Sequence, residues 1–127
     1  MLYKNVNLFK VSEDSRGEIF EVLGAKENAT IRNINYITGK AGAIRGQHSH
    51  KKDTHYCLVI GGRIEYSWVR KGEKKVQSMI LESGQMVLSE VGEQHKFTFL
   101  TDGIFLDFNT EARTPESYEK DTHRAEF

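Results

Sequence analysis

The sequence predicts an all-β protein whose strands close into an antiparallel barrel or sandwich. About eight to ten short stretches alternate apolar and polar residues, or hold β-branched and aromatic runs, as strands do. Turn-forming residues separate these stretches at close intervals, and almost no stretch has helical periodicity. A chain of 127 residues can bury a sizeable core, and no linker or repeat divides it. We therefore expect residues 1–127 to form a single domain.

The strands are expected to follow one another along the whole chain. Residues 18–23 alternate so that Ile19, Glu21 and Leu23 share one face, and residues 54–60 form the continuous apolar run of a buried strand. In chain order, strands are expected at residues 2–11, 18–23, 31–37, 54–60, 63–70, 74–81, 86–89, 96–100 and 104–108. Turns are expected at residues 12–15, 61–62, 71–73, 91–94 and 101–103.

Two segments are expected to depart from strand structure. Residues 38–46 are rich in glycine and irregular, and they must turn sharply at their end to direct His48. Near the C-terminus, Thr114 has the character of a helix N-cap, and Pro115 fits the first helical position. We therefore expect a short helical tail that ends at about Lys120.

Composition excludes several classes of function. Eighteen basic residues balance eighteen acidic ones, so no overall positive field would attract nucleic acid. No apolar run approaches the roughly 20 residues needed to span a membrane, and no signal-peptide core is recognised. The single Cys57 cannot form an internal disulfide, and its apolar strand predicts a buried core thiol. We expect a cytoplasmic protein that binds neither nucleic acid nor membrane.

Four of the five histidines lie in two stretches, residues 42–62 and 84–95. His48 and His50 stand two apart, which places both imidazoles on one face of an extended backbone. His55 opens the next strand, and the turn at residues 91–94 delivers His95 to a strand that can return to the pair. We therefore expect the four rings to converge.

Converging histidines permit two kinds of chemistry. They can bind a divalent metal, because imidazole suits zinc, copper, iron and nickel. Without metal, an imidazole whose pKa lies near neutrality can move a proton beside a substrate carbonyl. A purely structural role inside the barrel is a third possibility. The residues alone leave the choice open.

The two histidine stretches resemble the two motifs of the cupin superfamily. The first motif is Gly, five residues, His-x-His, three or four residues, Glu, six residues, Gly; it fits Gly42, His48, His50, His55 and Gly62, with histidine in place of glutamate. The second is Gly, five residues, Pro-x-Gly, two residues, His; it fits Gly84, Gly92 and His95, with Glu90 in place of proline. The resemblance implies a cupin jelly roll, a double-stranded β-helix barrel with a ligand pocket at its mouth.

Two narrower resemblances concern nucleotide sugars. Residues 45–51 (RGQHSHK) resemble the RG-x-H-A-H-K motif of the dTDP-sugar 3,4-ketoisomerases. In that family an active-site tyrosine stands twelve residues before the first histidine, and Tyr36 stands at the same distance from His48 here. Residues 14–21 resemble the D-x-R-G-x-x-x-E segment of the dTDP-4-dehydrorhamnose 3,5-epimerases. Without that resemblance, Asp14, Arg16 and Glu21 would be solvated turn residues. The length of the chain suits the ketoisomerases.

These resemblances imply an isomerase of deoxysugar or surface polysaccharide biosynthesis that converts a dTDP-4-keto-6-deoxyhexose by histidine acid/base proton transfer. The implied catalytic residues are His48, His50, Tyr36 and Arg45, and the implied substrate-binding residues are Arg16, Glu21, Lys51 and His95. No cofactor is required, although zinc, nickel or iron could bind at His48, His50, His55 and His95. A nucleotide-linked sugar is the expected partner, and an N-terminal strand that crosses to a second subunit implies a homodimer. A 3,5-epimerase, a metal-dependent dioxygenase-like cupin and a non-catalytic small-molecule-binding cupin remain open.

Overall fold

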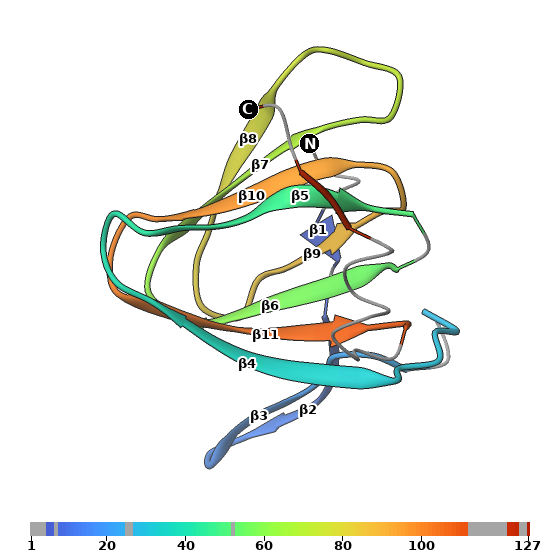
Figure 1. The fold of residues 1–127 in the computed structure, drawn as a ribbon. Helices are drawn as coiled ribbons and strands as arrows, with labels where there is room; N and C mark the ends of the chain where they lie inside the picture. Colours follow the sequence, from blue (N-terminus) through green and yellow to red (C-terminus); the bar gives the residue numbers. More distant parts are fainter. Residues whose placement is uncertain (1–4, 7, 25–26, 52, 112–121, 125–126) are drawn as a thin grey trace.

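Two five-stranded antiparallel sheets face each other as the walls of a barrel, and a separate two-stranded hairpin lies beside them (Figure 1). The structure is a computed structural model, and it describes residues 5–6, 8–24, 27–51, 53–111, 122–124 and 127. These residues contain twelve strands and no helix, which confirms the all-β prediction. Accordingly, none of the described residues forms a helix that could cross a membrane.

The order of strands brings distant parts of the sequence together. The first sheet has the order β1 (Asn5–Val6), β9 (Met86–Ser89), β6 (His55–Gly61), β11 (Gly103–Asn109) and β4 (Asn33–Gly39). The second has the order β12 (Thr122–Arg124), β5 (Ile44–His50), β10 (Gln94–Phe99), β7 (Ile64–Val69) and β8 (Gln77–Leu81). The hairpin pairs β2 (Phe9–Asp14) with β3 (Gly17–Glu21). All of the pairings are antiparallel.

The hydrophobic core fills the space between the two sheets. Trp68, Tyr66 and Phe99 are almost completely buried, and Phe97 stacks on Phe105 across the barrel with ring centroids 4.5 Å apart. Full burial of a side chain of this size contributes about 1.5–3 kcal/mol to folding. The expected burial of Cys57 is confirmed, since the thiol is 1% exposed and lies within this core.

Three rows of side chains on the inner face of the first sheet change from apolar to polar. The register aligns Ile37, Phe105 and Val59 in one row, Asn35, Asp107 and Cys57 in the next, and Asn33, Asn109 and His55 in the third. Side chains two residues apart on a strand share a face, so all three rows point into the barrel. The apolar row belongs to the core, and the polar rows place amides and carboxylates at one end of the barrel.

The β2–β3 hairpin differs from the sequence prediction. The predicted polar turn at residues 12–15 is wrong, because β2 continues to Asp14 and the turn consists of Ser15 and Arg16. One Asp14 carboxylate oxygen accepts the backbone N–H of Arg16 at 2.9 Å, and the other pairs with the guanidinium at 2.7 Å, which fixes this tight turn. Every residue of β2 and β3 is exposed, so this chain does not cover the face that holds Ile19 and Glu21.

Other boundaries also move. The strand expected at residues 2–11 is divided between β1 and β2, and the segment expected to be irregular at 38–46 is shorter, since β4 continues to Gly39 and β5 starts at Ile44. The predicted helical tail at residues 114–120 lies outside the described residues. After that segment, β12 pairs with the edge of β5, opposite His48 and His50.

Candidate active site

Four histidine rings converge at the polar end of the barrel, as the sequence predicts. Antiparallel pairing of β10 with β5 places His95 directly opposite His48. The ring centroid of His48 lies 4.5 Å from that of His50 and 4.9 Å from that of His95. The rings of His50 and His55 stack with centroids 4.3 Å apart. The cluster therefore joins the two sheets, because His55 belongs to β6 of the opposite wall.

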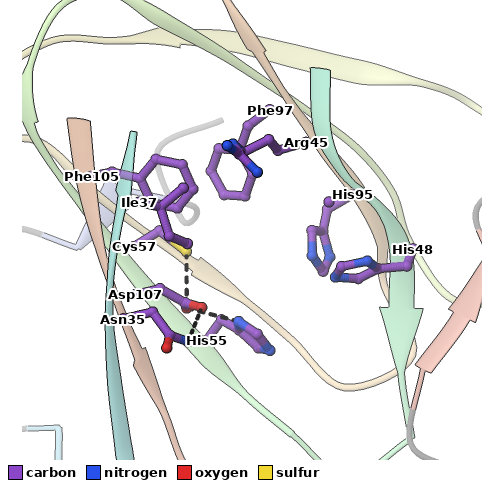
Figure 2. Close-up of a pocket in the computed structure, with 11 residues that line it drawn as sticks. Asn35, Ile37, Arg45, His48, His55, Cys57, His95, Phe97, Phe105 and Asp107 are labelled. Atoms are coloured by element: carbon purple, nitrogen blue, oxygen red, sulfur yellow. Dashed lines mark hydrogen bonds and ion pairs between the residues drawn. The ribbon is translucent and has the colours of Figure 1, made fainter. Parts of the chain in front are cut away.

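A cavity of about 180 Å³ opens beside this cluster (Figure 2). His48, His95 and Arg45 from the second sheet and His55 and Asp107 from the first line its polar part. Ile37, Phe97 and Phe105 form the apolar floor toward the core. A small apolar pocket with a few converging polar groups is the usual form of a site for a small ligand.

His55 is held between two buried carboxylates. Its Nδ1 lies 2.8 Å from Asp107 Oδ1, and its Nε2 lies 2.9 Å from Asp53 Oδ2, with all three side chains about 5% exposed or less. Burial by itself lowers the pKa of His55, but the two carboxylates outweigh it, so the pKa is raised above its ordinary value of 6.5. Both ring nitrogens of His55 are therefore engaged by carboxylates.

Neighbouring polar groups hold the two carboxylates in place. Asp107 Oδ1 also accepts Asn109 Nδ2 at 2.9 Å, and the Cys57 thiol lies 3.7 Å away. Asp53 Oδ1 accepts the backbone N–H groups of Thr110 at 3.1 Å and Glu111 at 3.2 Å. Burial raises the pKa of Asp53, yet the contacts with His55 prevail and lower it below the ordinary 3.8.

His95 has the opposite electrostatic environment. Its ring is buried, and its Nδ1–H donates to the Glu93 carbonyl at 3.3 Å, since a carbonyl can only accept. Burial, followed by the neighbouring His48, His55 and His50, lowers the pKa of His95 well below 6.5. His95 therefore stays neutral at physiological pH, and its Nε2 remains a hydrogen-bond acceptor.

Arg45 supplies the cationic group on the cavity wall. It is exposed, and its Nε donates to the Thr38 carbonyl at 2.9 Å. Figure 2 shows Arg45 beside Phe97 among the side chains that line the cavity. The bond to Thr38 leaves the rest of the planar fork for an anionic ligand. Among the described residues, Arg45 is the only lysine or arginine that lines this cavity.

The remaining predicted site residues lie elsewhere in this chain. Tyr36 points to the outer face of β4 and is 65% exposed, because it alternates with the inward Asn35 and Ile37. His50 is buried behind His48 and does not line the cavity. Lys51 is exposed, and Arg16 and Glu21 belong to the exposed hairpin.

Sequence reasoning missed both carboxylates of the site. Asp107 could have been found, since it falls in phase with Phe105 and Asn109 on the inward face of an otherwise aromatic strand. Asp53 lies in a short polar loop between β5 and β6, where no pattern distinguishes it from a solvated residue. Asn35 follows the same logic as Asp107, in phase with Ile37.

The four histidines expected as metal ligands do not form a single group. Donor atoms of His48, His50 and His95 lie within 4.8 Å of one another, and so do those of His50, Asp53 and His55. His50 belongs to both groups. The ring nitrogens of His55 contact Asp53 and Asp107, so His55 does not complete a four-histidine set in this arrangement.

Comparisons with solved structures support the fold. A 3,4-ketoisomerase from Helicobacter canadensis superposes with a TM-score of 0.78 at 21% identity, and the match covers 94% of each chain. A dTDP-4-dehydrorhamnose 3,5-epimerase from Bacillus anthracis, with TDP and pyrophosphate bound, gives 0.71 at 24% identity over 89% of this chain and 73% of that one. The capsular polysaccharide assembling protein CapF from Staphylococcus aureus gives 0.68 at 20% identity over 95% of this chain.

This chain spans only about a third, 35%, of the CapF chain. No protein-family model matches the sequence, and no curated protein matches it. The structural similarities confirm the cupin-like barrel of the sugar epimerases and ketoisomerases, which the two histidine motifs predict.

Proposed function

We propose that the chain is a nucleotide-sugar isomerase that interconverts the 4-keto and 3-keto forms of a dTDP-linked 6-deoxyhexose. The observation that carries this proposal is that His48, a half-buried imidazole, and Arg45 line the same cavity. The similarity to a 3,4-ketoisomerase over 94% of both chains supports the same reaction class. Residues 1–127 would act as one domain.

The reaction needs one proton moved between neighbouring carbons. His48 would remove the proton from the carbon beside the ketone, which gives an enediolate, and the former ketone oxygen would then take up a proton. Return of a proton to the former carbonyl carbon, with loss of the hydroxyl proton next to it, gives the isomeric ketone without any change in redox state. Positioned acid/base groups of this kind contribute about a hundred- to ten-thousand-fold each.

Other cavity residues would stabilise this intermediate. Arg45 would face the developing oxyanion or a phosphate, for which its planar fork is suited. The neutral His95 would accept a hydrogen bond from a sugar hydroxyl through Nε2, because its Nδ1–H is held by Glu93.

A second copy of the chain would complete the nucleotide site. The β2–β3 hairpin exposes Phe9, Val11 and Ile19, each more than half exposed, on a projection beside the barrel (Figure 1). Covering these apolar side chains would drive dimerisation. The same contact would place Arg16 and Glu21 against the cavity of the partner subunit, where they would hold the nucleotide.

Product analysis tests the reaction. The protein is incubated with dTDP-4-keto-6-deoxyglucose in deuterium oxide, and the sugar is followed by NMR. A ketone at C3 supports the proposed isomerisation, whereas a retained C4 ketone with inverted C3 or C5 identifies a 3,5-epimerase instead. No change in the sugar would contradict both and leave a metal-dependent or a purely ligand-binding cupin.

His48→Asn should lower turnover by at least about a hundredfold while the fold stays intact. Gln47→Asn is the matched control, since Gln47 is the exposed neighbour on the same strand and points away from the cavity. Retention of more than about a tenth of the wild-type rate would remove His48 from the role of essential base.

A further inference from the structure

We infer that His50, Asp53 and His55 form a binding site for a divalent transition metal, with Asp107 as the supporting carboxylate. The donor atoms of the three ligands lie within 4.8 Å of one another, and the three side chains are 2–4% exposed. This site differs from the four-histidine arrangement that the sequence motif implies, because it uses an aspartate from the β5–β6 loop and needs neither His48 nor His95. It does not depend on the proposed isomerase activity.

His55 is already oriented as metal-bound histidines are. Its Nδ1 contacts the Asp107 carboxylate at 2.8 Å, which directs Nε2 to Asp53. Histidine ligands almost always have such a carboxylate or carbonyl on the second ring nitrogen, where it fixes the tautomer and makes the ligating nitrogen more basic. Asn109 and Cys57 in turn hold Asp107, so the orientation of His55 is fixed before any metal arrives.

Asp53 is likewise prepared as a ligand through one oxygen. The backbone N–H groups of Thr110 and Glu111 bind Oδ1 at 3.1 and 3.2 Å, and Oδ2 faces His55 Nε2 at 2.9 Å. A carboxylate held in this way does not have to be reoriented on binding. The loop that holds Asp53 is also tied to β11, since the backbone N–H of Thr54 donates to Thr110 Oγ1 at 3.0 Å.

Charge balance favours a dication at this position. Asp53 and Asp107 are two buried carboxylates that lie on either side of His55. A divalent cation with two neutral imidazoles and these two carboxylates would give a neutral cluster.

The ligand types indicate which metals fit. Two imidazoles and one carboxylate suit zinc, iron(II) and nickel rather than magnesium or calcium, which prefer oxygen ligands. Of the three ligands, His55 lines the cavity, so the site adjoins it.

Among the described residues, two other groups compete with this site. The first competing group is His48, His50 and His95, whose three donors are all imidazole nitrogens and include no carboxylate to balance the charge of a cation. The second competing group is His55, Cys57 and Asp107, which shares only His55 with the proposed ligands. His50 belongs to the proposed site and to the first competing group, so variants of His48, His95, His50 and Asp53 together distinguish the three.

The test uses the full chain without a polyhistidine tag, freed of metal by a chelator and titrated with Zn²⁺ by calorimetry. The wild type should bind Zn²⁺, and His48→Gln and His95→Gln should bind it with nearly unchanged affinity. Asp107→Asn should weaken binding by about 10- to 100-fold, as loss of a supporting carboxylate does, and Asp53→Asn by at least that factor. Asp102→Asn is the matched control, because this carboxylate is exposed on the β10–β11 turn.

Circular dichroism of each metal-free variant checks that it folds. If Asp53→Asn fails to fold, His50→Gln takes its place, because the proposed site needs His50 and the second competing group does not. No Zn²⁺ binding by the wild type would overturn the proposal. Loss of binding in His48→Gln and His95→Gln with retention in Asp53→Asn would overturn it in favour of the first competing group, and retention of binding in His50→Gln and Asp53→Asn would overturn it in favour of the second.

Discussion

Gly62 provides a quantitative test of the barrel geometry. It follows β6, closes the first cupin-like motif and has a φ of +82°, a conformation that L-residues rarely adopt. A Cβ at this position would overlap the Asp102 carbonyl oxygen and lie 2.8 Å from Gly103 Cα. These atoms belong to the backbone of the neighbouring turn, so no side-chain rotation can relieve the overlap.

The cost of Gly62→Ala can be estimated from these two effects. The left-handed backbone costs about 1–2 kcal/mol for a residue with a Cβ. Forcing a methyl group into occupied space costs about 1–3 kcal/mol more. We therefore expect the free energy of unfolding to fall by about 2–5 kcal/mol. Urea titration followed by fluorescence measures this change, since the single Trp68 is fully buried.

Gly61→Ala is the matched control one residue away. Gly61 has no positive φ, and a Cβ there would meet no atom within 4 Å. This substitution should leave stability unchanged or raise it by about 0.4–1 kcal/mol, because alanine restricts the unfolded chain. Equal stability of the two variants would refute the turn geometry described here.

Three further predictions concern titration, a buried network and assembly. Burial keeps the pKa of His95 well below 6.5, so the unfolded chain takes up a proton as the pH falls below 6.5 and the folded chain does not. The wild type should therefore lose stability relative to His95→Gln between about pH 7 and pH 5, and a pH-independent difference would contradict this. Tyr66→Phe should destabilise the fold by about 1.5–3 kcal/mol, because it removes the 2.9 Å hydrogen bond to the buried Glu93 carboxylate. Thermal denaturation measures this change, and an unchanged melting temperature would contradict the prediction. Light scattering should give about twice the 14.6 kDa chain mass, and Ile19→Ser on the exposed hairpin should shift the protein toward monomer. A monomeric wild type would exclude the shared nucleotide site.

Local patterns were sufficient for most strands. Continuous or alternating apolar runs predicted β6, β7, β9 and β11, and the burial of Cys57 followed from its run. The spacing of His48 and His50 predicted a shared face on an extended backbone, and both residues lie on β5, which was not among the strands predicted from the sequence. The hairpin turn was misplaced, since the hydrogen bonds that Asp14 accepts there depend on the pairing of β2 with β3.

Spacing between motifs was less informative. Tyr36 stands at the family distance from His48, yet in this chain it lies on the outer face of β4. A count of residues between two strands does not fix the face on which a side chain lies, because the parity is set within each strand by its own neighbours. Whether Tyr36 serves a site formed with a second subunit stays a prediction.

The sequence by itself determined the all-β class, the cupin-like barrel and the convergence of the histidines, because period-two patterns and two spaced motifs are local properties of the chain. Only the tertiary structure decided that Asp107 and Asp53 enclose His55. Asp107 lies 52 residues from His55, and they meet because β11 pairs with β6 when the barrel closes. Which strands become neighbours depends on how the whole sheet buries its apolar face, and no window of sequence contains that information.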